Sequence, residues 1–264
     1  MAEEKKDRTG NCSGGKGSVS VVGIGPGGLE HLTDRAKAAL TGADCIVGYT
    51  RYVDLIKPIV EGKELFSTGM THEVQRCGAA IEFARLGKKV AVVSSGDSGI
   101  YGMAGLILQL AYADKELNGG IHIEVIPGIP AFVSAASILG APLMHDFASI
   151  SLSDLLTDWE KIEERVEAAA KADFVTILYN PKSTKRIEGL TKAIGIISRY
   201  RENTTPVGLV RNASRQGEEA IITTLGEVEK YFDNVDMLTI LIIGNSATFT
   251  DCGHMITPRG YKVV

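Results

Sequence analysis

The sequence has few cysteines and no long apolar run, and these two absences exclude several classes of protein. Its four cysteines among 264 residues lie far apart and form no CxxC motif, which argues against a disulfide framework or a structural zinc site. No apolar run approaches the ~20 residues that cross a bilayer, so we expect no membrane partner. From the spacing of the cysteines we also expect no metal site. A reducing cytoplasm is the expected compartment.

An excess of charge of one sign is also missing, because 28 Lys and Arg oppose 32 Asp and Glu and leave a net charge of −4. General nucleic-acid binders carry a broad basic face, so we expect no nucleic-acid partner. The 8 prolines and 30 glycines are spread along the chain, which excludes a collagen and a wholly disordered protein. Residues 1–17 are polar and Gly-rich without the apolar core of a signal peptide, and we expect a flexible tail.

From Ser18 onward, short apolar runs alternate with helical patterns, which is typical of α/β domains. In the first half we expect strands at 18–24, 45–47, 90–93 and 121–126, and helices at 33–40, 71–86 and 100–112. In the second half we expect strands at 148–152, 174–179, 206–211, 220–224 and 238–243, and helices at 159–171, 184–200 and 225–232. The sequence therefore predicts two α/β domains, at residues 18–143 and 144–264, the first with a largely parallel sheet.

The segment GIGPGG at Gly23–Gly28 follows the first expected strand and satisfies the GxGxxG string of dinucleotide sites. In those sites the helix opens directly at the glycines, so that its amide groups meet the pyrophosphate. Here Thr33 is the better helix start, and the second expected strand ends without the acidic residue that would bind a ribose. A ligand-lining loop is favoured over a simple turn. A nicotinamide-dependent oxidoreductase and a non-catalytic nucleotide-binding module stay as alternatives.

The segment GNCSGGKG at Gly10–Gly17 nearly spells a P-loop. However, Gly17 replaces the Ser or Thr that would bind magnesium, and the segment precedes a strand instead of following one. Both departures argue against nucleotide binding by this segment.

The segment SSGDSGIYGMAG at Ser94–Gly105 follows an expected buried strand. Its small residues would let a ligand approach the backbone closely, and Asp97 would lie where the crevice of a parallel sheet opens. The Asp97 carboxylate can accept hydrogen bonds from a ribose, an ammonium or an amide. It can equally cap a helix that begins near Ser98, and the pattern does not decide between these roles.

Three further segments follow expected strands. In IPGIPAFVSAASILGAPL, at 126–143, a packing helix after a turn is favoured. LYNPKSTKR at 178–186 and VRNASRQGE at 210–218 place polar side chains at strand ends. Their cations suit a polycarboxylate ligand, although each one alone is equally well an ordinary solvated side chain; they are Lys182, Lys185, Arg186, Arg211 and Arg215.

Taken in order, GIGPGG-LEHLT, SSGDSGIYGMAG, PGIPA…LGAPL and LYNPKS resemble the tetrapyrrole methylase family over residues 18 to about 262. The resemblance implies two α/β domains with S-adenosylmethionine in the cleft between them and S-adenosylhomocysteine as a product. In this chain Pro130 stands where the family often has Ser or Thr, so a hydroxyl contact is lost there. The family's cofactor positions match Pro26, Gly96, Asp97, Ile100, Ala131, Tyr179, Asn180 and Ala213.

Several segments are similar to one branch of that family, namely VGYTRYVDLI, STGMTHEVQR, the SLSDLLT…W stretch and MITPRGY. This branch methylates carbon 17 of precorrin-3B or cobalt-precorrin-3, with ring contraction, in cobalamin synthesis. The resemblance implies a tetrapyrrole substrate and a homodimer. It leaves open whether the substrate contains cobalt, and another ring methylase, such as the carbon-11 enzyme, is the alternative.

Ring contraction needs proton transfer at the edge of the macrocycle, and hence a general acid or base. Some relatives have a catalytic Asp at the end of the second strand, where this chain has Gly48-Tyr49. The candidates for proton transfer are Tyr49, His72, Glu73 and Asp154, and the sequence does not choose among them. For the carboxylates of the substrate we expect cationic partners, with Arg51, Arg76, Arg211 and Arg215 as the candidates.

Overall fold

The computed structural model describes residues 17–114, 120–183 and 188–262. It divides into two compact units, which we call unit 1, up to Pro130, and unit 2, from Ala131 onward. The division falls earlier than the boundary that we expected after residue 143, because the helix at 131–139 packs on strands of unit 2. Residues 1–16 of the predicted tail, with most of GNCSGGKG, lie outside the described residues, as do the cations Lys185 and Arg186. Gly17, which we expected in the tail, already belongs to a strand.

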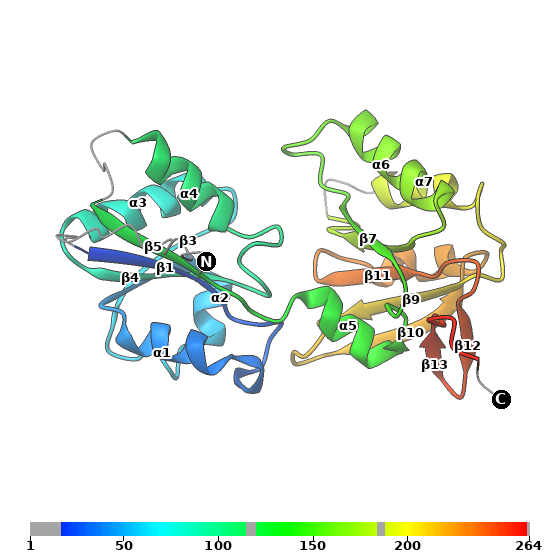
Figure 1. Ribbon diagram of the computed structural model, residues 1–264, viewed down its shortest axis with the longest axis horizontal. Coiled ribbons are helices and arrows are strands. Elements are labelled where there is room, and N and C mark those ends of the chain that lie inside the picture. Colours follow the sequence, from blue (N-terminus) through cyan, green and yellow to red (C-terminus); the bar gives the residue numbers. More distant parts are fainter. Residues whose placement is uncertain (1–16, 115–119, 184–187, 263–264) are drawn as a thin grey trace, which may run out of the picture. The chain divides into compact units, whose positions relative to one another are not determined.

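Unit 1 contains a five-stranded sheet with helices on both sides (Figure 1). Its strand order is β3-β2-β4-β1-β5. All of its neighbouring strands are parallel, which confirms the expected sheet. The elements are β1 (Gly17–Gly23), η1 (Leu29–His31), α1 (Asp34–Gly42), β2 (Cys45–Tyr49), α2 (Thr50–Leu55), β3 (Glu64–Thr68), α3 (Glu73–Arg85), β4 (Lys89–Ser94), α4 (Ala104–Ala113) and β5 (Ile121–Ile126).

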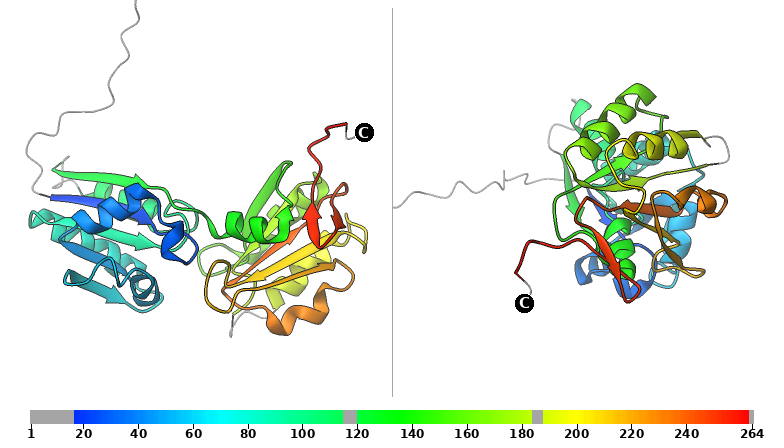
Figure 2. Two further views of the ribbon diagram at one scale, coloured as in Figure 1. Left: turned by 90° about the horizontal axis from the view of Figure 1, so that it is seen from below. Right: turned by 90° about the vertical axis from the view of Figure 1, so that its right-hand side faces the viewer.

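Two helical layers cover the two faces of this sheet. Helices α3 and α4 pack on one face and α1 and α2 on the other, and the left view of Figure 2 shows α1 in front of the strands. Side chains of β1 alternate between the two cores, since Val19 and Val21 join α3 and α4, whereas Val22 joins α1 and α2. A strand buried on both faces reads as a continuous apolar run, which made these strands visible in the sequence.

Of the three helices expected in unit 1, α1 and α3 lie close to their expected bounds and α4 does not, whereas α2 was not expected. Thr33 caps α1, with its Oγ1 accepting a hydrogen bond from the Ala36 N–H at 3.1 Å. The helix expected from residue 100 begins only at Ala104. The Ser98 hydroxyl donates to the main-chain carbonyl of Val21 at 3.2 Å and Tyr101 has a positive φ of 53°, so the chain before Ala104 is held in an irregular loop.

Unit 2 contains a five-stranded sheet with the order β10-β9-β11-β8-β7. Only β7 and β8 are parallel, and the other pairs are antiparallel. A short sheet of three strands, in the order β12-β13-β6, completes the unit. The elements are α5 (Ala131–Leu139), β6 (Gly140–Ala141), β7 (Phe147–Ser151), α6 (Trp159–Lys171), β8 (Val175–Tyr179), α7 (Glu188–Ile197), β9 (Pro206–Arg211), β10 (Glu219–Thr224), η2 (Val228–Asn234), β11 (Thr239–Ile243), β12 (Phe249–Asp251) and β13 (His254–Ile256).

Helices α6 and α7 cover one face of the large sheet and α5 packs on the other (Figure 1). Gly208 in β9 makes room for α5, because a Cβ there would lie 2.3 Å from Leu139 Cδ1. The helix expected at 225–232 is a 3₁₀ helix at Val228–Asn234. Its expected start is lost because the N–H groups of Leu225 and Gly226 donate to carbonyls of a preceding loop. Among the described residues, no helix has the length and apolarity to cross a membrane.

Candidate functional site

The carboxyl ends of β1 and β4 form the topological switch point of unit 1. These strands are neighbours, but the chain continues from β1 to α1 on one face and from β4 to α4 on the other. In open parallel sheets, ligands bind outside the carboxyl ends of the strands at such a point. The GIGPGG and SGDSG segments follow these two strands, so the fold brings both Gly-rich loops to one edge of the sheet.

The loops after β1, β4 and β5 pack backbone against backbone at this edge. The Gly25 N–H donates to the Gly96 carbonyl at 3.1 Å, and the Gly96 N–H donates to the Gly25 carbonyl at 2.7 Å. Both residues have positive φ, 76° and 67°, which favours glycine. A Cβ on Gly128 would lie 2.2 Å from the Gly96 carbonyl oxygen. These glycines are therefore required by contacts between the loops, and Gly128 joins the site although its sequence indicated only a turn.

Asp97 connects two of these loops through its carboxylate. Its Oδ1 accepts a hydrogen bond from the Gly99 N–H at 2.8 Å and its Oδ2 accepts one from the Gly128 N–H at 3.0 Å. The helix-cap alternative is wrong, because α4 begins at Ala104 with Met103 as its N-cap. Each carboxylate oxygen keeps a further lone pair, so Asp97 can also accept a hydrogen bond from a ribose hydroxyl or an ammonium group.

The other predicted cofactor positions of unit 1 lie in the same two loops. Pro26 is buried next to Gly25, and Ile100 is half-buried, with its N–H 3.4 Å from the Asp97 carbonyl. The helix after GIGPGG begins only at Asp34, with the 3₁₀ turn η1 intervening. The direct loop-to-helix junction of a dinucleotide site is therefore absent from this described segment, as the position of Thr33 predicted.

Unit 2 gathers polar side chains at one edge of its large sheet. Strands β8 and β9 are both antiparallel to β11, so their carboxyl ends lie at the same edge, together with the end of β7. Tyr179 ends β8, and its hydroxyl accepts a hydrogen bond from the Phe132 N–H of α5 at 3.3 Å. Asn180 has a positive φ of 51°, and its Nδ2 donates to Ser151 Oγ at 3.0 Å.

The loop after β9 joins the same edge. Ala213 is buried between Asn212 and Ser214, which both have positive φ. Ser214 Oγ lies 2.7 Å from Ser134 Oγ in α5, and Ala131 is the first residue of that helix. The structure of unit 2 therefore brings together its four predicted cofactor positions, Ala131, Tyr179, Asn180 and Ala213.

Three of the four candidates for proton transfer lie in unit 1. Tyr49 is the last residue of β2 and pairs in register with Thr68 at the end of β3. His72 is exposed just before α3, and Glu73 is the first residue of that helix. The fourth candidate, Asp154, is an exposed residue of unit 2 between β7 and α6.

The candidate cations differ in their burial and in the bonds that they form within the protein. Arg76 is only 3% exposed, and it donates hydrogen bonds to Thr68 Oγ1 and to Glu73 Oε1. Arg51 is exposed on α2, and Arg215 is half-buried, with its N–H donating to the Asn212 carbonyl at 2.8 Å.

Arg211 is held between two carboxylates of unit 2. Its Nε donates to Asp236 Oδ2 at 3.0 Å, and its Nη1 lies 3.5 Å from Glu219 Oε2. The hydrogen bond that Arg211 donates to Asp236, together with the negative charge of both carboxylates, raises the pKa of Arg211 above its ordinary value. These ion pairs account for the residue without a substrate.

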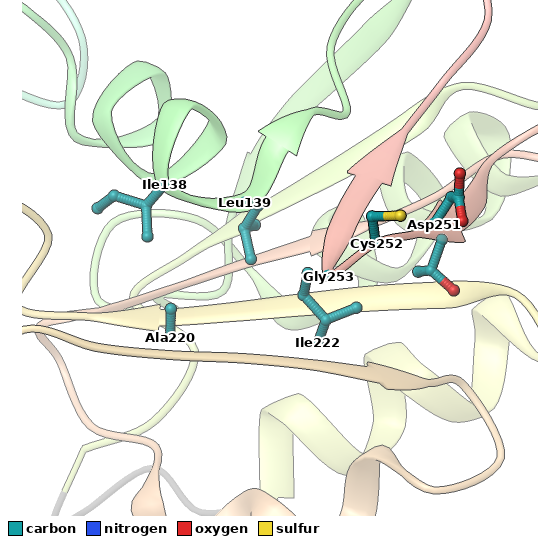
Figure 3. Close-up of a pocket in the computed structure, with 8 residues that line it drawn as sticks. Ile138, Leu139, Ala220, Ile222, Asp251, Cys252 and Gly253 are labelled. Atoms are coloured by element: carbon teal, nitrogen blue, oxygen red, sulfur yellow. The ribbon is translucent and has the colours of Figure 1, made fainter.

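A cavity of about 530 Å³ in unit 2 lies between α5, β10 and the turn from β12 to β13 (Figure 3). Its walls combine apolar side chains with the polar turn, and none of the predicted site residues lines it. The lining residues are Ile138, Leu139, Ala220, Ile222, Thr250, Asp251, Cys252 and Gly253. Within the described ranges, no group of three or more His, Cys, Asp or Glu residues is arranged to hold a metal ion.

Comparisons with known proteins agree with this arrangement of loops. The family model for Tetrapyrrole (Corrin/Porphyrin) Methylases matches residues 18–229. A Salmonella typhimurium protein, named probable cobalt-factor III C(17)-methyltransferase, is 49% identical over 93% of this chain and 100% of its own. A Priestia megaterium protein, named cobalt-factor III methyltransferase, is 50% identical over 94% of this chain, which spans only 46% of that relative's length.

Among solved structures, that of the methyltransferase CobJ has a TM-score of 0.86 and 36% sequence identity, and the match covers 92% of this chain and 100% of that one. The fold and the family match together indicate a methyltransferase of the tetrapyrrole methylases, a family that uses S-adenosylmethionine. The chain belongs to the tetrapyrrole methylase family.

Proposed function

We propose that this protein transfers a methyl group from S-adenosylmethionine to carbon 17 of cobalt-factor III, with ring contraction, in cobalamin synthesis. The observation that carries the proposal is the 49% identity to the Salmonella protein over that protein's full length. The sequence left open whether the substrate contains cobalt. The names of both the Salmonella and the Priestia relatives specify cobalt-factor III, which supports the cobalt-containing substrate.

The residues at the switch point of unit 1 fit the methyl donor. Asp97 offers a half-buried carboxylate whose oxygens keep further lone pairs, next to the close backbone contact between Gly96 and Gly128. Such an acceptor suits ribose hydroxyls and an ammonium group. We assign cofactor binding in unit 1 to Pro26, Gly96, Asp97 and Ile100. The same role for Ala131, Tyr179, Asn180 and Ala213 is supported by their gathering at one edge of unit 2. The cleft expected between the domains stays a prediction.

The bound cofactor supplies an electrophilic methyl group on a sulfonium. The protein's part in the transfer is to align the substrate carbon with that methyl group, and such orientation lowers the barrier by several kcal/mol. Ring contraction additionally requires a residue that moves a proton. Tyr49 ends β2, and His72 and Glu73 lie at the start of α3, which follows the neighbouring strand β3. This placement supports this part of unit 1 as the site of proton transfer. Asp154 stays a candidate in unit 2.

A cytoplasmic homodimer completes the proposal. The homodimer rests on the resemblance to the family. The cytoplasm is supported by Cys45, Cys77 and Cys252, which are all free thiols, as expected in a reducing compartment.

The deciding experiment is a methylation assay of the purified protein with S-adenosylmethionine labelled with ¹³C in its methyl group. Cobalt-factor III and metal-free precorrin-3B are supplied in separate reactions, and mass spectrometry and NMR locate the new methyl group. We expect a carbon-17 methyl on cobalt-factor III only. A methyl group at carbon 11 would support the other ring methylase, and turnover of precorrin-3B alone would overturn the choice of substrate.

A binding assay separates this proposal from an oxidoreductase built on GIGPGG. S-adenosylhomocysteine at about one hundred times its Kd stabilises the folded protein by about 2.7 kcal/mol, and we expect the corresponding rise in Tm. NADH at the same concentration is expected to leave Tm unchanged. The opposite pattern would contradict the proposed cofactor.

A further inference from the structure

The buried guanidinium of Arg76 reaches both ends of the loop that joins β3 to α3. At the start of the loop, its Nη1 donates to Thr68 Oγ1 at 2.7 Å and to the Gly69 carbonyl at 2.6 Å. At the end of the loop, its Nη2 donates to Glu73 Oε1 at 3.1 Å. We call these contacts the Arg76 clamp. A single side chain therefore fixes the positions of residues 68, 69 and 73 relative to one another.

The surroundings of Arg76 do not suit a side chain that binds a substrate from solvent. It is 3% exposed, and its terminal nitrogens are already bonded to groups of the loop. Its Nε is buried without a hydrogen-bond partner among the residues that the structure describes. A buried donor without a partner destabilises a fold, so stability alone does not explain an arginine at this position.

The clamped loop is not in a relaxed conformation. Thr71 has a positive φ of 68°, which is a rare backbone conformation for a β-branched residue. Such conformations persist only where the surrounding contacts determine them, and they cluster at functional sites. The Arg76 clamp provides such contacts on both sides of Thr71.

The clamped loop ends at the candidates for proton transfer. His72 is exposed at its end, and Glu73 accepts the hydrogen bond from Arg76. Tyr49, on the neighbouring strand, pairs with Thr68, and its ring centroid lies 6.0 Å from Arg76 Cζ. At this distance an aromatic ring attracts a guanidinium. Arg76 therefore lies beside the Tyr49 ring and bonds to the Glu73 carboxylate, and its main-chain N–H donates to the His72 carbonyl at 3.0 Å.

We propose that Arg76 is a positioning residue, which holds the loop 68–73 so that His72 and Glu73 lie beside Tyr49 for the proton transfer of ring contraction. The inference rests on the proposed function, and it deepens that function by assigning the step that the clamp serves. It also replaces the role predicted from the sequence, because Arg76 acts through the loop and does not bind the carboxylates of the substrate.

The test is a pair of substitutions at Thr68, where the clamp is weakened without removing a charge. Thr68→Val removes the acceptor hydroxyl and preserves the branched shape, whereas Thr68→Ser retains the hydroxyl. We expect Thr68→Val to lower kcat with cobalt-factor III about tenfold and to shift the pH profile of kcat, since misplaced catalytic groups lose rate. The KM for cobalt-factor III and the Kd for S-adenosylhomocysteine should stay unchanged, and Thr68→Ser should restore the rate and the pH profile.

A second variant removes the guanidinium itself. Arg76→Met should lower kcat about a hundredfold, again at unchanged KM. The matched control is Arg85→Met, in the same helix, because Arg85 also makes an i,i+3 ion pair, with Glu82, but lies at the far end of α3. Its kcat should equal that of the unmodified protein. A raised KM at unchanged kcat for Arg76→Met would show that Arg76 binds the substrate directly, and unchanged kinetics and pH profile in Thr68→Val would overturn the clamp.

Hydrogen exchange tests the clamp without any turnover. Amides of residues 69–73 should exchange faster in Thr68→Val than in Thr68→Ser, while those at the far end of α3 stay protected. Equal exchange in the two variants would refute the clamp whatever the substrate is. If the unmodified protein binds S-adenosylhomocysteine but does not methylate cobalt-factor III, the proposed function fails on its own, and the exchange data still decide whether Arg76 holds the loop.

Discussion

The Asp97 carboxylate in the loop after β4 accepts a hydrogen bond from the Gly128 main-chain N–H, 3.0 Å away in the loop after β5. The strands that precede these loops lie on either side of β1. One side chain therefore joins loops across the switch point before any ligand binds. Such preorganisation lowers the entropy that binding must overcome, so Asp97 links the shape of the loops to cofactor affinity.

Asp97→Ala should weaken cofactor binding and, to a smaller extent, the fold. The loss of a charged hydrogen-bond partner should reduce the free energy of S-adenosylhomocysteine binding by roughly 1.5–3 kcal/mol. The two main-chain amides left without their acceptor should reduce the free energy of unfolding by about 1 kcal/mol. Isothermal titration and urea denaturation measure the two effects separately.

Asp44→Ala is the matched control for this substitution. Asp44 Oδ2 also accepts a main-chain hydrogen bond, from the Lys89 N–H at 2.8 Å, but at the start of β4. It should lose stability without any change in cofactor affinity. If Asp97→Ala behaves in the same way, the Asp97 carboxylate only braces the loops.

Gly128→Ala should disrupt the junction of the three loops. The new Cβ would lie 2.2 Å from the Gly96 carbonyl oxygen and 2.7 Å from that of Gly23, and backbone cannot move aside as a flexible side chain can. We expect the free energy of unfolding to fall by about 3 kcal/mol, together with loss of S-adenosylhomocysteine binding. Urea denaturation measures the first effect, and unchanged stability would contradict the close packing.

Gly78→Ala provides the comparison, because Gly78 lies within α3 and, apart from its chain neighbours and the backbone of its own helix, no described atom lies within 4 Å of the added Cβ. Alanine is favoured over glycine in a helix by about 0.5–1 kcal/mol. This variant should therefore gain stability and keep its cofactor affinity.

The strands of unit 1 could be predicted where they are buried on both faces, and not elsewhere. The strand β4 reads as the apolar run VAVV because its residues Val90 to Val93 are all buried. The edge strand β3 was missed, because Glu64, Leu65 and Ser67 are exposed and leave no continuous apolar run. Antiparallel pairing in unit 2 was equally invisible, since central strands of either kind give the same apolar pattern.

The site could be predicted as a set of loops at strand ends, but the partners of its side chains could not. Asp97 forms a hydrogen bond with Gly128, and Arg211 forms one with Asp236, although the partners are far apart in the sequence. The register of the strands brings these pairs together, and no local spacing indicates it. For the same reason the sequence showed Arg76 as a cation available to substrate, whereas the fold buries it against the end of β3.

Two cysteines should be unreactive in the folded protein. Cys45 in β2 and Cys77 in α3 are fully buried, and burial raises the pKa of each thiol to about 11. At pH 8 both are protonated, and the thiolate is the reactive form, so iodoacetamide should modify the exposed Cys252 before either of them. Peptide mapping by mass spectrometry measures this order, with protein in urea as the control in which Cys45 and Cys77 react as well. Native modification of Cys45 at the rate of Cys252 would contradict the buried strand.

Arg211→Lys should leave kcat and the KM for cobalt-factor III unchanged, because the guanidinium already forms ion pairs with Asp236 and Glu219. Lysine lacks the planar fork that holds two carboxylates, and exposed ion pairs contribute little to stability, so the free energy of unfolding should fall only slightly. The comparison is Arg51→Lys, which alters an exposed cation of α2 and should raise the KM for cobalt-factor III. Steady-state kinetics and urea denaturation measure both variants. A similar rise in KM for Arg211→Lys would show that Arg211 leaves its two carboxylates to bind those of the substrate.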